Sequence, residues 1–255
     1  EKQTLIRTWN GHDAIVVDFS FDPSGNYLAT ASTDGTAKVW DVATGNLLGT
    51  YYNKQTTYAG KEIGWAVSFA VFSHDSRFLY YGGDGATIFQ VRLGRNDSGS
   101  LYAEKAIYTY PVKEYDRDKM QRITGGELLN SGGAIVCTIG YYTQVIQISD
   151  GAVLKSMYYS LDPLNDVVIG PQHGQVTTWS FNGHATVWNL ATGAIHSSYD
   201  AGDLMEICSP SFSNDRQMMA TAASGHEAHI WDVKNHKKIA TLMGHKEVVR
   251  IAKFS

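Results

Sequence analysis

The sequence is poor in cysteine: Cys137 and Cys208 are the only two in 255 residues. They stand far apart and form no Cys-x-x-Cys pair, which argues against a disulfide framework and against a zinc ribbon. Both fall in predicted strands, so we expect two free, buried thiols, as in proteins of a reducing compartment. We therefore expect an intracellular protein, either cytoplasmic or nuclear.

An excess of positive charge and a long hydrophobic run are also missing. Lys and Arg number 21 against 25 Asp and Glu, giving a net charge of −4, so the chain has no overall basic character for nucleic acid, although a local patch stays open. The longest apolar-rich run, GWAVSFAVFS, is too short to span a membrane. The opening EKQTLIRTWN lacks the apolar core of a signal peptide. We expect no membrane association, and we expect the sequon at Asn96 to stay unmodified.

A recurring phrase dominates what the sequence does contain. Residues 29–45 read ATASTDGTAKVWDVATG, in which Asp34-Gly35 is a two-residue hairpin turn that needs positive φ angles. Similar phrases follow as SFNGHATVWNLATG (180–193) and TAASGHEAHIWDV (221–233). A tryptophan fills the same slot each time, at Trp40, Trp188 and Trp231. A period of about 40–45 residues with four strands is typical of propeller blades.

The period predicts an all-β fold, a β-propeller of four-stranded blades. About five complete blades are expected, at residues 11–52, 65–112, 119–159, 165–199 and 205–243. Residues 5–9 and 244–255 are expected to supply single strands of an incomplete closing blade. Because single end strands leave open sheet edges, and seven blades need about 300 residues, we expect this chain to be part of a seven-bladed ring.

The first repeat, from Gly11-His12 to Trp40-Asp41, resembles the WD-repeat family of β-propellers. The resemblance implies a hydrogen-bonded tie in each blade, made by His, Ser or Thr, Asp and Trp. The first repeat has all four positions, the fourth has three of them with Asn in place of Asp, and the fifth keeps the Trp with Gly225 at the Asp position. The second repeat has Gln90 in the Trp position, so we expect it to rely on packing. The expected tie residues are His12, Ser32, Asp34, Trp40, Ser180, Asn182, Trp188 and Trp231.

A more specific resemblance covers the first two repeats. Phe21-Asp22-Pro23, Leu28-Ala29-Thr30 and the segment from Leu79 to Thr87 are similar to the transducin-β-like tandem-propeller subunit of the small-ribosomal-subunit processome. That resemblance implies a nucleolar scaffold in ribosome biogenesis and pre-rRNA processing, bound mainly to proteins and close to RNA without a dedicated RNA-binding motif.

Catalytic and metal-binding patterns are not found in the sequence. His226-Glu227-Ala228-His229 has its histidines three apart in a predicted hairpin, whereas a zinc-protease pair needs them four apart on a helix. The runs GGDG and GGELLNSGG lack the Lys-Ser/Thr context of a phosphate loop. We expect no enzyme activity, no catalytic residue, no metal, no cofactor and no small-molecule substrate.

Three segments interrupt the period, at residues 53–64, 93–105 and 113–122, and each is either a solvated loop or a binding loop. We predict a non-catalytic scaffold that mediates protein–protein interactions in a multisubunit complex. The alternative is a reader of a short or modified peptide at the top face, for which Tyr51, Tyr52 and Tyr58 are the visible aromatic candidates; an enzyme domain would need clustered carboxylates. The candidate partner-binding residues are Tyr51, Tyr52, Tyr58, Lys113, Tyr115, Arg117 and Arg122.

Overall fold

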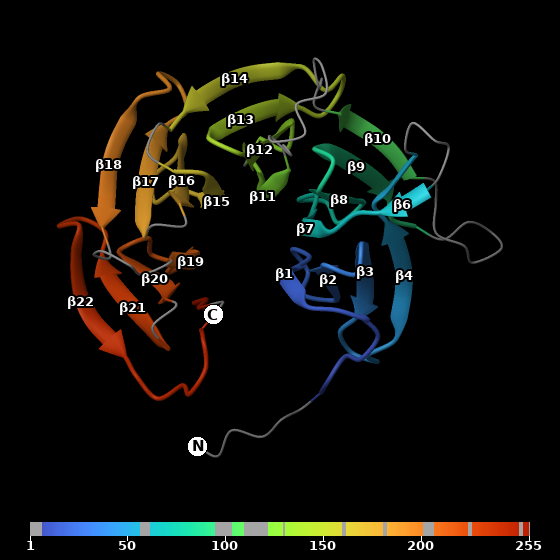
Figure 1. Cartoon of the computed structure of the whole chain (residues 1–255), viewed down its shortest axis with the longest axis horizontal. Helices are drawn as coiled ribbons and strands as arrows, with labels where there is room; N and C mark the ends of the chain where they lie inside the picture. Colours follow the sequence, from blue (N-terminus) through green and yellow to red (C-terminus); the bar gives the residue numbers. More distant parts are fainter. Residues whose placement is uncertain are drawn as a thin grey trace. The chain divides into compact units, whose positions relative to one another are not determined.

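The fold is all-β in the part of the chain that the computed structural model describes. It forms five four-stranded antiparallel sheets and one two-stranded ribbon, with no helix among the described residues (Figure 1). The predicted all-β fold class, with five four-stranded sheets, is confirmed. The described residues are 7–56, 62–94, 104–109, 122–129, 131–159, 162–180, 183–200, 207–223, 226–249 and 252–254.

Each sheet takes its strands in sequence order, so every connection inside a sheet is a hairpin. The first sheet holds β1 (Val16–Phe21), β2 (Tyr27–Ser32), β3 (Thr36–Asp41) and β4 (Leu47–Tyr52). The second sheet holds β7 (Val67–Phe72), β8 (Phe78–Gly83), β9 (Thr87–Arg92) and β10 (Glu104–Thr109). The ribbon between them pairs β5 (Lys54–Thr56) with β6 (Glu62–Gly64).

The remaining three sheets repeat the same order. The third holds β11 (Ile123–Leu128), β12 (Ala134–Ile139), β13 (Tyr142–Gln147) and β14 (Val153–Tyr158). The fourth holds β15 (Leu164–Ile169), β16 (Gln175–Ser180), β17 (His184–Asn189) and β18 (Ile195–Asp200). The fifth holds β19 (Ile207–Phe212), β20 (Met218–Ala223), β21 (Glu227–Asp232) and β22 (Lys237–Leu242).

The chain divides into two compact units. The first contains residues 1–135 and 147–152, and the second contains residues 136–146 and 153–255. The first and second sheets therefore lie in the first unit, and the fourth and fifth sheets lie in the second.

The middle strands of the sheets are buried on both faces, which removes the polar–apolar alternation of a half-exposed strand. β2 and β3 are buried at nearly every position, and β16 at all of them. Outer strands differ, since β22 is exposed throughout. Small and apolar residues of the first two sheets pack into one core, and a second core built on Trp179 and Trp231 joins the fourth and fifth sheets.

Tight turns connect these strands as the sequence predicts. Gly35 follows Asp34 with φ of +85°, and its N–H donates to the Ser32 carbonyl at 3.2 Å. A Cβ on Gly35 would lie 3.2 Å from the Trp65 carbonyl oxygen. The position therefore combines a left-handed backbone with little room for a side chain, and both favour glycine. The Asp34-Gly35 pair thus sets both the turn and its close approach to residue 65.

The ends of the chain differ from the expectation for a closing blade. Residues 7–9, 248–249 and 252–254, which we expected in single strands, are not in strands. A strand needs a hydrogen-bonded neighbour, and none of the described strands pairs with these segments. The closing blade and the blade boundaries remain predictions.

Candidate functional site

A chain of polar side chains crosses the first sheet. His12 Nδ1 lies 2.7 Å from Asp34 Oδ2, and His12 Nε2 lies 2.7 Å from Thr30 Oγ1. The Trp40 indole donates to Thr30 Oγ1 at 2.9 Å. Because a carboxylate can only accept, Nδ1 carries a ring hydrogen and donates it to Asp34. We call this buried network of His12, Asp34, Thr30 and Trp40 the first polar tie.

Asp34 is the acceptor at the end of this tie. Its carboxylate also accepts the backbone N–H groups of Asp13 at 3.0 Å and Thr36 at 2.9 Å, and the Thr36 hydroxyl at 2.6 Å. Burial acts to raise the pKa of Asp34, but the hydrogen bonds from Thr36, His12 and Asp13 outweigh it and lower the pKa to about 2. The group stays ionised and committed to the fold, which makes it a poor general base.

The tryptophan contact recurs in the second unit. Trp188 donates to Thr178 at 2.7 Å in the fourth sheet, and Trp231 donates to Thr221 at 2.9 Å in the fifth. Each indole reaches the diagonal neighbour on the paired strand, since Trp188 pairs with Val176 across the ladder. All three tryptophans, including Trp40, are only 3% exposed. Their rings are therefore part of the buried core.

The serines expected in the tie have other places. Ser32 accepts the N–H of Asp34 at 3.1 Å, inside the turn, and does not meet Trp40. Ser180 Oγ is buried with no hydrogen-bond partner among the described residues. The threonine two residues earlier is the acceptor that sequence reasoning missed; the diagonal geometry of an antiparallel ladder would have pointed to it. Asn182 and Gly225 lie outside the described residues.

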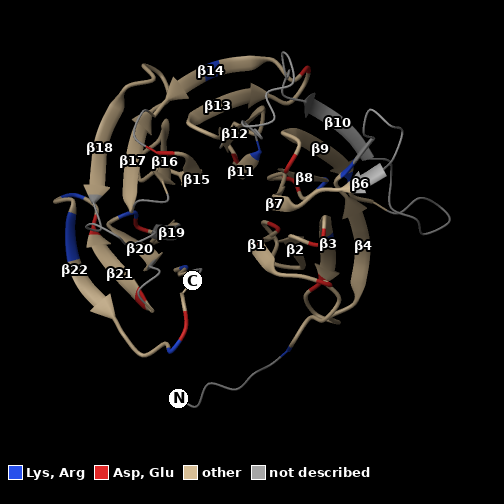
Figure 2. Ribbon diagram, viewed as in Figure 1, with Lys and Arg blue, Asp and Glu red and all other residues tan. Residues whose placement is uncertain are grey.

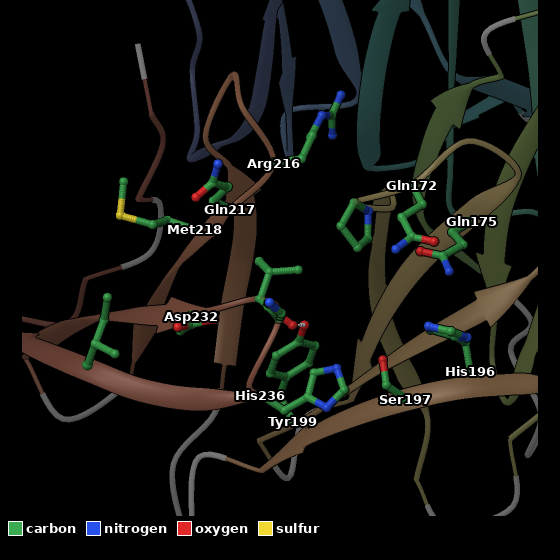
Figure 3. A pocket seen from close by; sticks show the side chains of 14 residues that line it. Gln172, Gln175, His196, Ser197, Tyr199, Arg216, Gln217, Met218, Asp232 and His236 are labelled. Atoms are coloured by element: carbon green, nitrogen blue, oxygen red, sulfur yellow. Dashed lines mark hydrogen bonds between the residues drawn. The ribbon is translucent and has the colours of Figure 1, made fainter.

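A cavity of about 610 Å³ opens between the fourth and fifth sheets. We call it the joint pocket. Its walls are the turns at 170–175, 213–218 and 232–236 and the outer strands β18 and β22 (Figure 3). These turns all join a first to a second strand, or a third to a fourth. The pocket therefore lies at the edge of the sheets opposite the Asp34-type turns.

One wall of the joint pocket holds an unsatisfied acceptor. Gln175 is 5% exposed, and its Oε1 has no hydrogen-bond partner among the described residues. Figure 3 shows the amide groups of Gln172 and Gln175 together on this wall, with His196 below them. A buried carbonyl oxygen without a donor is costly, so this atom needs a ligand or a water molecule.

The floor of the joint pocket is aromatic and hydrogen-bonded. The Tyr199 hydroxyl donates to the Val233 carbonyl at 3.2 Å, and the His236 ring stands edge-on to the Tyr199 ring at 5.0 Å. Burial, together with the charge of Asp232, raises the pKa of Tyr199 to about 12. Asp232 itself accepts from Asn235 through both oxygens, at 3.0 and 2.9 Å. Neither group is placed to move a proton at neutral pH.

The comparison with known families rests on the first repeat. The family of the WD domain, G-beta repeat, matches residues 3–41, which contain the complete first polar tie. Residues 3–41 are therefore similar to a WD40 repeat. Proteins with these repeats generally bind other proteins.

Curated relatives match short parts of the chain. The denticleless protein homolog of Danio rerio is 48% identical over 56 residues, 22% of this chain and 9% of that protein. The ribosome biogenesis protein erb1 of Botryotinia fuckeliana is 50% identical over 46 residues, 18% of this chain and 6% of that protein. A guanine nucleotide-binding protein subunit beta of Nicotiana tabacum is 37% identical over 76 residues, 30% of this chain and 19% of that protein. The chain spans less than a fifth of the length of each.

The Asp of the Trp-Asp signature has a local role. Asp41 accepts the Thr44 N–H at 2.6 Å and the Thr44 hydroxyl at 2.7 Å, which caps the turn between β3 and β4. Asn189 caps the matching turn of the fourth sheet by accepting from Ala191 and Thr192. The residue after each tryptophan thus holds the next hairpin.

The expected partner-binding residues are only partly brought together. Tyr51 is wrong as a binding-loop residue: it lies in β4, is 7% exposed and packs in the core with its ring 6.3 Å from Tyr81. It is buried because the inward face of β4 meets the second sheet. Tyr52 is half exposed, with Lys54 Nζ 5.1 Å from its ring centre, and Arg122 is exposed. The remaining candidates, Tyr58, Lys113, Tyr115 and Arg117, lie outside the described residues.

Groups that could carry chemistry are otherwise sparse. Within the described ranges, no set of three His, Cys, Asp or Glu side chains could hold a metal ion, and no helix could span a membrane. Glu227 Oε2 lies 3.1 Å from His229 Nε2, while His226 sits in the preceding turn with φ of +70°. Cys137 is buried and its pKa is raised by burial, so its thiol stays protonated.

Proposed function

We propose that this chain is a non-catalytic scaffold that binds other proteins in a multisubunit complex. The observation that carries the proposal is that the side chains that could take part in catalysis are hydrogen-bonded within the fold or buried in it. Asp34, the carboxylate with the pKa near 2, is saturated by donors from its own repeat. Cys137, the described thiol, is fully enclosed. What faces solvent is a set of hairpin turns on rigid sheets, and such surfaces serve binding.

A role in ribosome biogenesis is the more specific form of this proposal. The similarity over 46 residues to the ribosome biogenesis protein erb1 supports this role. The match over 37 residues to the mouse protein named WD repeat and HMG-box DNA-binding protein 1 supports a location in the nucleus. The partners would then be assembly proteins, with RNA nearby. Pre-rRNA processing and a nucleolar location follow from the same proposal.

A capture experiment tests the scaffold. The tagged full chain is expressed in eukaryotic cells, and its bound proteins are quantified with and without RNase. We expect near-stoichiometric protein partners that survive RNase, ribosome assembly proteins among them. Partners of another process would retain the scaffold and reject the ribosomal role. Recovery of the chain alone, with purified chain that turns over a substrate, would contradict the proposal as a whole.

A further inference from the structure

Three residues at the joint pocket differ from their equivalents in the first and second sheets. In the first unit, the turn after β1 is closed by the Asp22 N–H and the Tyr27 carbonyl at 3.0 Å, and in the second unit the turn after β15 is closed by the Gly170 N–H and the Gln175 carbonyl at 2.9 Å. Gly170 thus occupies the Asp22 position, and Gln175 that of Tyr27. Across the joint, Arg216 occupies the Ser76 position, with nearly the same φ of 58° against 57°.

The joint between the first and second sheets is sealed by these residues. Ser76 donates from the second sheet to Asp22 Oδ2 at 2.7 Å, and the same carboxylate accepts from Ser24 and from the Tyr27 N–H. Burial acts to raise the pKa of Asp22, but these hydrogen bonds hold it below its ordinary value. A saturated carboxylate therefore fills the space between those sheets.

The joint between the fourth and fifth sheets lacks this seal. Gly170 has no side chain, and Arg216 reaches the carbonyls of Ile169 and Gly170 at 3.4 Å each, a weak contact at the upper rim. A Cβ on Gly170 would lie 2.7 Å from the Cβ of Gln175, so Gln175 crowds the place that the Asp22 side chain takes in the first unit. The cavity opens beside Gln175, whose Oε1 is buried without a donor among the described residues.

We propose that the joint pocket binds an acidic, extended peptide segment of a partner protein. The proposal rests on the proposed scaffold function and names its site. A peptide N–H supplies the donor that Gln175 Oε1 lacks. Apolar surface for a side chain comes from Val233 and from Ile239, which is 54% exposed on β22.

Charge selects the acidic sequence. Lys234 and Arg216 both line the pocket, and both are exposed. The one carboxylate of the lining, Asp232, accepts from Asn235 through both oxygens and keeps its negative charge, which attracts Lys234 and leaves the two cations in excess by one. Lys237 and Lys238 follow at the start of β22, which is blue in Figure 2. A carboxylate of the bound segment is therefore attracted by the two cations that the turns of the fifth sheet supply.

A peptide fits this site better than a nucleic acid. The unsatisfied group is an acceptor, which a phosphate cannot satisfy, and β22 offers an exposed outer strand with Ile239 and Leu242 on its surface. Backbone N–H groups of an extended chain can address both features.

The test uses fluorescein-labelled, N-acetylated octapeptides in which Glu is fixed at one or two positions, and the same set with Gln in place of Glu. Binding to the full chain is measured by fluorescence anisotropy. We expect the Glu peptides to bind and the Gln set to bind at least about tenfold more weakly. Lys234→Gln should weaken binding about threefold, and Gln175→Met about tenfold because the buried acceptor is lost. Lys246→Gln, an exposed lysine outside the lining, is the matched control.

A second variant protects the test against misfolding of Gln175→Met. Ile239→Glu changes an exposed residue, so the fold should survive while the new carboxylate repels the acidic peptide and abolishes binding. Equal affinity of all variants, or tighter binding of a single-stranded RNA decamer than of any peptide, would overturn the proposal. If the pocket variants leave RNase-resistant protein capture intact and no peptide binds, the site is wrong and the scaffold stands.

Discussion

Asp34 shows how one residue can organise a repeat. It accepts from His12, from the Thr36 hydroxyl and from two backbone N–H groups. Asp34→Ala leaves these donors unpaired in a partly buried place, so we expect the free energy of unfolding to fall by about 1–3 kcal/mol. Urea denaturation measures the loss. The exposed neighbour Asp13→Ala should change it by less than about 0.5 kcal/mol, and equal effects of both variants would show that the tie is dispensable.

The same carboxylate makes stability depend on acid. The folded-state pKa of Asp34 is about 2, below the ordinary value of 3.8. A lowered pKa contributes stability that is present above about pH 4 and is lost as the pH falls through 2. The shift corresponds to about 2 kcal/mol. We expect the difference in unfolding free energy between wild type and Asp34→Asn to shrink by that amount from pH 5 to pH 2. A difference that stays constant with pH would contradict this.

At the scale of elements, the number of partners of each threonine acceptor predicts how much that threonine stabilises its sheet. Thr30 Oγ1 serves both His12 and Trp40, whereas Thr178 serves Trp188. Thr30→Val should therefore cost about 2 kcal/mol of unfolding free energy and Thr178→Val about 1, because each unsatisfied partner adds its own penalty. Urea denaturation of the two variants gives the comparison, and a larger loss at Thr178 would refute the ranking.

The turn after β15 depends on a missing side chain. A Cβ on Gly170 would lie 2.7 Å from the Cβ of Gln175 and 2.8 Å from its carbonyl carbon. Gly170→Ala must push the two strands apart, and we expect it to lower thermal stability by the equivalent of about 1–3 kcal/mol. Gly133→Ala, where a Cβ meets nothing within 4 Å, is the control. Calorimetry measures both, and an unchanged melting temperature of Gly170→Ala would show that the turn has room.

How much of this could be read from the sequence differs by element. The repeated Trp slot and the Asp-Gly turns predict the five sheets because period and turn chemistry are local. The acceptor of the indole was misplaced by two residues, since it depends on the diagonal across a ladder, as between Trp40 and Thr30. The joint pocket was missed because Gly170 and Arg216 gain meaning only when two sheets are packed together. Tyr51 falls inside the first predicted blade, at residues 11–52, but the sequence does not show that its side chain packs against the second sheet.

On the scale of the whole molecule, the two compact units differ in the contacts that they contain. The first unit carries the complete polar tie and the sealed joint, which are devices of stability. The second unit keeps the tryptophan–threonine contacts while its joint is open and lined by basic and amide groups.

Hydrogen–deuterium exchange of the full chain, free and in the complex that it captures, tests the central claim that this molecule acts by holding partner proteins on its surface. Partner binding slows exchange of the amides that it covers. We predict slower exchange in the complex at residues 170–175, 213–218 and 232–239, with the buried strands β2, β3 and β16 unchanged. Exchange that is the same in the free and captured chain at every peptide would contradict the claim.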